Sequence, residues 1–104
     1  MSKFAHSNFF TSFFNAIKTI VQKEKNISPV KAKFLLIDAF NHEKYWTVDL
    51  KLEYEDGVRL CFASVVLDQE YYVQQLVNAL KTEYCYISQD YDKHSKCTTY
   101  LFEL

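Results

Sequence analysis

The chain has 104 residues, of which 49% are hydrophobic and 24% are charged, and its formal net charge is −1. This length fits one globular domain over residues 1–104 and excludes two ordinary domains. The near-neutral charge excludes a strong general attraction to nucleic acid or to anionic lipid. The longest unbroken apolar runs have four residues, so we expect no membrane-spanning segment and no membrane partner.

The charges are unevenly distributed along the chain. Residues 1–36 carry a net charge of +5, and residues 37–104 carry −6. This asymmetry predicts a bipolar surface if the two segments do not interleave in space. The alternative is that basic and acidic elements of one fold simply pair with each other.

Cysteine usage indicates the compartment. The chain has three cysteines, Cys61, Cys85 and Cys97, and no CxxC pair. An odd number without paired spacing argues against a disulfide framework, and the Phe-rich N-terminal stretch lacks a small-residue cleavage pattern. We therefore expect three free thiols and a reducing, cytoplasmic setting.

The first predicted element is a helix over residues 6–25. Apolar residues recur there at steps of three and four, with polar residues on the opposite face. Ser7 is the predicted N-cap, and Asn26 and Pro29 are expected to end the helix. The apolar stripe holds more phenylalanine than a thin core needs, which leaves surface for a second copy or a partner. It comprises Phe9, Phe10, Phe13, Phe14, Ile17, Ile20 and Val21.

Two strands and a hairpin turn are predicted next. The first strand covers residues 30–40, and the second, residues 45–54, alternates apolar and polar residues. Asp56-Gly57 then indicates a turn into a third strand.

The hydrophobic pattern favours a three-residue turn, Glu55 to Gly57, over a two-residue one. The pairs that this turn predicts are Tyr54 with Val58, Leu52 with Leu60, Leu50 with Phe62, and Glu53 with Arg59. In that register Ala63, Val65 and Leu67 share the outer face of the sheet. We therefore expect the third strand to be central and partly covered on both sides.

The rest of the chain predicts a helix and two strands. Asp68 is the expected N-cap of the helix, whose buried stripe is Tyr72, Val73, Leu76, Val77 and Leu80. Strands follow over residues 84–91 and 97–104, and we expect the last one to be an edge. The order α-β-β-β-α-β-β predicts an α+β fold, a single antiparallel sheet of about five strands with two helices on one face.

Motifs for chemistry are scarce. A single glycine excludes GxGxxG and the P-loop, and neither GxSxG nor HExxH occurs. Cys85, His94 and Cys97 could ligate zinc, but the paired knuckles of structural zinc sites are missing. We expect no metal and no cofactor. His42 and His94 could catalyse metal-free acid–base cleavage of RNA. We favour the alternative that both are exposed loop histidines without a catalytic role.

Aromatic residues are in surplus, with nine Phe, eight Tyr and one Trp. Exposed aromatics interleaved with Lys can stack bases, and they also anchor protein interfaces. The later strands are acidic and the chain has one arginine. These features favour a protein partner over nucleic acid.

We therefore expect a small binding protein, not an enzyme, that inhibits a protein by steric and electrostatic occlusion. In size, compactness and lack of catalytic motifs it resembles immunity proteins and phage-borne inhibitors of bacterial defence. That resemblance implies a cognate toxin or defence effector as partner, such as a basic nuclease or another nucleic-acid-handling protein. The expected binding residues are Tyr45, Asp49, Lys51, Glu53, Glu55, Asp56, Arg59, Asp92 and His94.

Two other functions stay open. The element order resembles that of class I type III secretion chaperones, which implies a dimeric chaperone or adaptor. The binding inhibitor described above could also be a homodimer. The third reading is a small metal-free ribonuclease that uses His42 or His94.

Overall fold

The computed structural model describes residues 3–27, 33–41 and 45–103. The predicted element order α-β-β-β-α-β-β is confirmed. The elements are α1 (Lys3–Ile27), β1 (Lys33–Asn41), β2 (Tyr45–Glu53), β3 (Arg59–Leu67), α2 (Glu70–Glu83), β4 (Cys85–Asp92) and β5 (Cys97–Glu103). Neither helix, within these residues, is long and apolar enough to span a bilayer.

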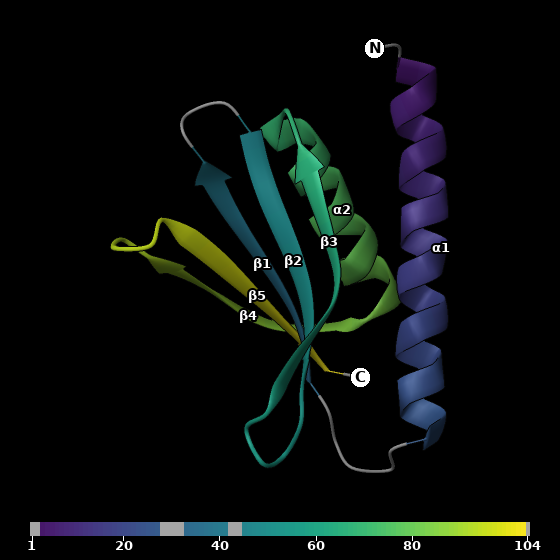
Figure 1. The fold of residues 1–104 in the computed structure, drawn as a ribbon, viewed down its shortest axis with the longest axis vertical. Helices are drawn as coiled ribbons and strands as arrows, with labels where there is room; N and C mark the ends of the chain where they lie inside the picture. Colours follow the sequence, from purple (N-terminus) through teal and green to yellow (C-terminus); the bar gives the residue numbers. More distant parts are fainter. Residues whose placement is uncertain (1–2, 28–32, 42–44, 104) are drawn as a thin grey trace.

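The five strands form one antiparallel sheet in the order β3-β2-β1-β5-β4. Both helices pack on one face of this sheet, with α1 beside α2 at the β3 side of the molecule (Figure 1). The α+β class is therefore confirmed. Two predicted strand positions are wrong, because β3 is an edge strand and β5 is interior. The chain places β5 between β1 and β4, so β4 takes the edge.

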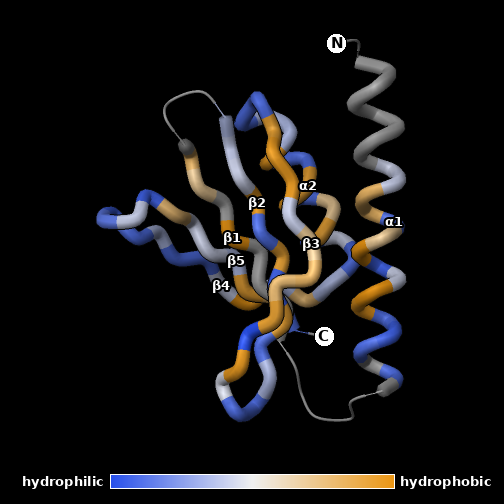
Figure 2. The backbone as a smooth tube through the Cα atoms, viewed as in Figure 1, coloured by the Kyte–Doolittle hydropathy of each residue, from blue (hydrophilic) through white to orange (hydrophobic). Residues whose placement is uncertain are grey.

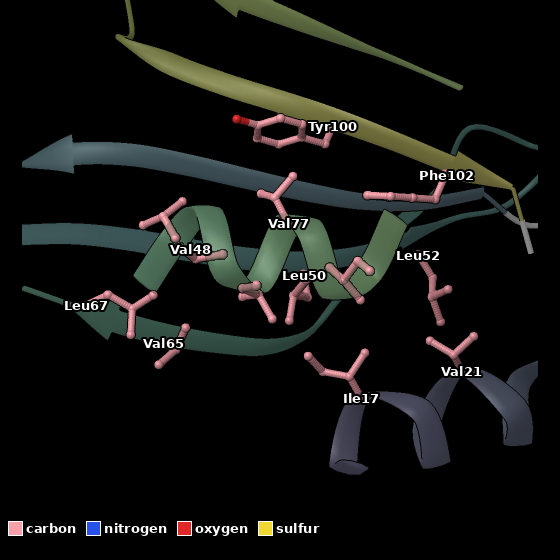
Figure 3. Packing of buried hydrophobic residues seen from close by; sticks show 13 residues of the cluster. Ile17, Val21, Val48, Leu50, Leu52, Val65, Leu67, Val77, Tyr100 and Phe102 are labelled. Carbon is pink, nitrogen blue, oxygen red and sulfur yellow. The ribbon is translucent and has the colours of Figure 1, made fainter. Parts of the chain in front are cut away.

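The hydrophobic core lies between the sheet and the two helices (Figure 3). Val48, Leu50 and Leu52 alternate along β2, face the helices and are fully buried, as the period of two requires. Among the α1 side chains that the structure describes, Ile17 and Val21 are buried in this core. The buried residues are Ile17, Val21, Val48, Leu50, Leu52, Val65, Leu67, Val73, Leu76, Val77, Leu80, Tyr100 and Phe102.

The β2–β3 hairpin has the predicted three-residue turn. The Tyr54 amide donates to the Val58 carbonyl at 2.9 Å, and the Gly57 amide donates to the Tyr54 carbonyl at 2.9 Å. Gly57 has φ of +86°, in the left-handed region that glycine adopts most readily. The predicted pairs of Leu52 with Leu60 and of Glu53 with Arg59 are confirmed.

A β-bulge changes the register of this hairpin beyond Leu52. Leu50 pairs with Ala63, and Phe62 is the extra residue, so the predicted pairing of Leu50 with Phe62 is wrong. The shift by one residue turns Val65 and Leu67 towards the helices, where both are buried. The expectation of an outer row of Ala63, Val65 and Leu67 is therefore also wrong.

The helix boundaries differ from the predicted ones. Helix α1 begins at Lys3, so Ser7 lies inside the helix and is not its N-cap; Asn26 is still helical. Pro29 lies outside the described residues. In α2 the N-cap is Gln69, which makes no side-chain capping bond, so the N-cap role expected for Asp68 is wrong.

Candidate functional site

The face of the sheet away from the helices is open across the described strands. Alternate residues of β2 lie on it, and all of them are half-buried. They are Tyr45, Thr47, Asp49, Lys51 and Glu53. The register extends this face across the sheet. One row runs from Ser64 through Asp49, Ile37 and Thr99 to Asp90.

The sequence-predicted binding residues divide between the two ends of this face. Tyr45 begins β2, whereas Glu53 ends it together with Glu55, Asp56 and Arg59. A strand of this length separates its two ends by about 27 Å. The strand register also places the Asp92–Cys97 end of the β4–β5 hairpin beside Ala39, at the Tyr45 end. The nine residues therefore do not form one compact site.

At the hairpin end, several of the predicted charges are engaged within the fold. The Arg59 Nε donates to Glu53 Oε1 at 2.9 Å, a favourable cross-strand ion pair. Asp56 Oδ1 accepts the Val58 amide at 3.1 Å and so stabilises the turn. Glu55 is exposed at the tip. This end can offer Glu55 to a partner more readily than the paired charges.

Two exposed apolar side chains stand beside these acids, and the sequence reasoning missed them. Val58 is 56% exposed and Leu60 is 51% exposed. Leu60 lies on the helix side of β3, opposite buried Leu52, but the hairpin projects beyond α2 (Figure 1). The turn residues Asp56-Gly57 could have indicated this exposure in part, because the residues around a hairpin turn lie at the protein surface.

Midway along the face, Ser64 Oγ donates to Asp49 Oδ1 at 2.7 Å. This bond crosses from β3 to β2 and holds Asp49 in place. Lys51 pairs in register with Cys61 of β3. Asp49 and Lys51 lie two residues apart on the outer face of β2, so the negative charge of one offsets the positive charge of the other.

At the other end, Asp92 and His94 belong to the hydrophilic β4–β5 hairpin tip (Figure 2). The His94 amide donates to Asp92 Oδ1 at 2.9 Å. Hydrogen bonds from the His94 amide and from Ser95 hold the pKa of Asp92 below its ordinary value. His94 itself is exposed on the turn. Asp92 therefore stabilises the turn.

The proposed zinc set is not assembled. In β4, Cys85 pairs with Glu103, while Asp92 at the opposite end pairs with Cys97. Seven residues of extended strand put about 23 Å between the Cys85 and Asp92 ends. Cys85 therefore cannot share a metal with His94 and Cys97. Within the parts of the chain that the structure describes, no group of His, Cys, Asp and Glu could hold a metal.

Aromatic residues gather on β4 and α2 instead of in the core alone. Tyr91 is 57% exposed, Tyr71 is 61% exposed and Tyr86 is 36% exposed. Lys81 Nζ lies 4.4 Å from the centre of the Tyr86 ring, a cation–π contact. Part of the aromatic surplus noted in the sequence thus lies at the surface.

The ribonuclease reading depends on His42 and His94. His42 lies outside the described residues. The ends of the flanking strands, Asn41 and Tyr45, lie at the same end of the sheet as the hairpin that carries His94. His94 is exposed on that hairpin.

Comparison of the chain with protein-family models, with curated proteins and with solved structures gives no match.

Proposed function

We propose that this chain is a small inhibitor that binds a basic protein partner and blocks it by steric and electrostatic occlusion. The observation that carries this proposal is the composition of the β2–β3 hairpin tip. Exposed Val58 and Leu60 stand there next to exposed Glu55 and Asp56. Apolar side chains with charges around them are the usual composition of a protein interface.

The charge of the sheet and α2 indicates the chemistry of the partner. Residues 45–103 carry ten acidic and five basic side chains. Such a surface attracts a basic partner and accelerates its association. The cleft of a nuclease, of a toxin or of another nucleic-acid-handling effector has this character, since it must bind phosphate.

The test begins with affinity capture from the native cell, followed by purification of the recovered protein. Its association rate with the wild-type chain should fall as ionic strength rises. Glu55→Lys should slow association about tenfold, because it reverses a charge at the tip. Val58→Ser should accelerate dissociation instead, because it removes apolar contact area.

Asp68→Lys is the matched control, with the same charge change at an exposed site at the other end of β3. It should leave the association rate near that of the wild type. The proposal fails if Glu55→Lys and Asp68→Lys are indistinguishable at low ionic strength. It also fails if the recovered protein keeps its full activity in the complex.

A dimeric chaperone or adaptor is the second candidate, and the element order favours it. Analytical ultracentrifugation separates the two functions. A stable homodimer that keeps an aggregation-prone client in solution supports the chaperone, whereas a monomer that forms a one-to-one complex supports the inhibitor.

A further inference from the structure

Among the strands that the structure describes, β4 has only β5 as a neighbour. It is the last strand of the sheet and pairs with β5 alone. All eight of its residues, Cys85 to Asp92, are exposed. Every second residue of such a strand directs its N–H and C=O groups away from the sheet, where they can pair with another chain.

The two faces of β4 differ in chemistry. Gln89 pairs with buried Tyr100, so Gln89 and Tyr91 lie on the helix side of the sheet. Ser88, Asp90 and Asp92 lie on the outer face. The regular part of the strand therefore presents an aromatic ring on one face and two carboxylates on the other.

A β-bulge limits how much of β4 can pair with a new strand. The register shifts between Tyr86 and Ser88, which leaves residues 88–92 as a regular segment. Bulges and charges are devices by which edge strands avoid indiscriminate pairing. Here both charges are acidic, and no Lys, Arg or Pro lies within β4. Pairing is thereby restricted to a partner of opposite charge.

We propose that the free side of β4 binds an extended segment of the protein partner by strand addition, a segment in which basic residues alternate with apolar ones. The inference rests on the proposed function, because it takes the partner to be a protein. The basic side chains lie on the outer face beside Asp90 and Asp92. The apolar side chains lie on the helix side beside Tyr91.

A second copy of the chain fits this edge less well than a basic segment. Two β4 strands in antiparallel pairing would bring Asp90 and Asp92 of one copy close to the same acids of the other. No basic residue between Cys85 and Asp92 offsets this repulsion. Charge complementarity therefore selects the basic segment over self-association.

The probe is a heptapeptide of alternating lysine and valine, added to the full chain and followed by amide NMR. Binding should shift the amide signals of Ser88 to Asp92 and protect alternate amides there from hydrogen exchange. A peptide of the same composition with its lysines and valines in separate blocks, and an alternating glutamate–valine peptide, should bind at least about tenfold more weakly.

Two single variants test the electrostatic part. Asp90→Lys should weaken binding of the lysine–valine peptide about tenfold, because an attraction becomes a repulsion. Asp68→Lys carries the same charge change on the far side of the sheet and should leave the affinity unchanged. Asp90 is the better target than Asp92, which accepts the His94 amide in the turn.

Two proline variants at neighbouring uncharged positions, Ser88→Pro and Gln89→Pro, test the backbone part. Neighbouring amides point to opposite sides of a strand, so one variant loses a bond to β5 and the other loses only an outward donor. The variant that loses only the outward donor should fold with a circular dichroism spectrum like that of the wild type and should not bind the peptide.

The outcomes separate this inference from the proposed function. Equal binding of the blocked peptide, signal shifts confined to other strands, or a homodimer with β4 protected each overturn the inference. If the captured partner binds the folded proline variant as tightly as the wild type, the inference fails and the proposed function survives. If the peptide binds at β4 and the captured protein is not inhibited, the inference survives and the proposed function fails.

Discussion

The hydroxyl of Tyr54 donates a 2.9 Å hydrogen bond to Oε2 of Glu24, which lies 30 residues earlier in the chain. Tyr54 directly precedes the β2–β3 turn, and Glu24 lies near the C-terminal end of α1. The bond therefore ties the N-terminal helix to the hairpin that carries the proposed binding tip. A second tie, between Lys18 and Glu83 at 3.7 Å, joins α1 to the end of α2.

Tyr54→Phe should lower the free energy of unfolding by about 0.5–1.5 kcal/mol, because it removes this bond and keeps the ring that packs against the core. Urea denaturation followed by circular dichroism measures the change. Lys18→Met is a useful contrast, because its ion pair with Glu83 is solvent-exposed and should be worth less than about 1 kcal/mol. A larger loss in Lys18→Met than in Tyr54→Phe would contradict this ranking.

Alkaline pH should weaken the same contact. Burial, the hydrogen bond to Glu24 and the charge of Glu24 all raise the pKa of Tyr54 above its ordinary value of 10.0. The folded state thus favours the protonated phenol. The stabilisation is fully present below pH 10.0, the ordinary pKa that applies to the unfolded chain, and is lost as pH rises through the folded-state pKa.

The unfolding free energy of the wild type should therefore fall above that pH, and Tyr54→Phe should fall less steeply. Burial and the charge of Glu83 also raise the pKa of Tyr84, so a shallower slope should persist in Tyr54→Phe. If the unfolding free energies of the wild type and Tyr54→Phe fall in parallel with pH, the pKa of Tyr54 does not differ between the folded and unfolded states.

Gly57 should resist substitution because of its backbone and not because of crowding. Its φ is +86°, and a Cβ atom placed there would meet nothing within 4 Å. Gly57→Ala should cost about 1–2 kcal/mol from the left-handed conformation alone, and Gly57→Asn should cost less. Thermal melts of the three proteins provide the comparison. An alanine variant as stable as the wild type would mean that the turn can adopt another conformation.

The local sequence pattern predicted the β2–β3 turn correctly and the strand register beyond Leu52 wrongly. The turn chemistry of Gly57 and the pairing of Glu53 with Arg59 are set by neighbouring residues, so the sequence alone was sufficient. The bulge at Phe62 is decided by packing, because the extra residue turns Val65 and Leu67 into the core. No local rule announces such an insertion.

The candidate site was harder to predict than the fold. Period and capping say which residues share a face, but strand order decides which faces and edges stay open. The acids of the hairpin and Asp92 were all named as expected binding residues, and the register places them at opposite ends of the sheet. The exposed edge of β4 follows only from the order β3-β2-β1-β5-β4, which the sequence alone left open.

The Glu53–Arg59 pair allows the contribution of one cross-strand ion pair to stability to be measured. Exchanging the two residues, Glu53→Arg with Arg59→Glu, keeps the net charge and the cross-strand attraction, so unfolding free energy should stay within about 0.5 kcal/mol of the wild type. Glu53→Arg alone places two cations opposite each other and should cost up to about 1 kcal/mol. If the exchanged protein is as unstable as the single variant, the pair is not the source of the stability.

The attachment of α1 should depend strongly on its buried residues Ile17 and Val21. Ile17 and Val21 are the α1 residues in the described core, with Phe13 and Phe14 packed against it. Ile17→Ala should cost about 2–4 kcal/mol, whereas Val66→Ala, at a side chain 61% exposed, should stay within about 0.5 kcal/mol.

Native-state hydrogen exchange shows where the Ile17→Ala loss falls. Because Ile17 and Val21 are the α1 side chains buried in the described core, the α1 amides should lose protection at lower denaturant than those of β2 in Ile17→Ala. The central strands are held by ladders on both sides and should exchange only on global unfolding. If α1 and β2 lose protection together in this variant, the helix and the sheet unfold as one cooperative unit, and α1 is as integral to the fold as the central strands.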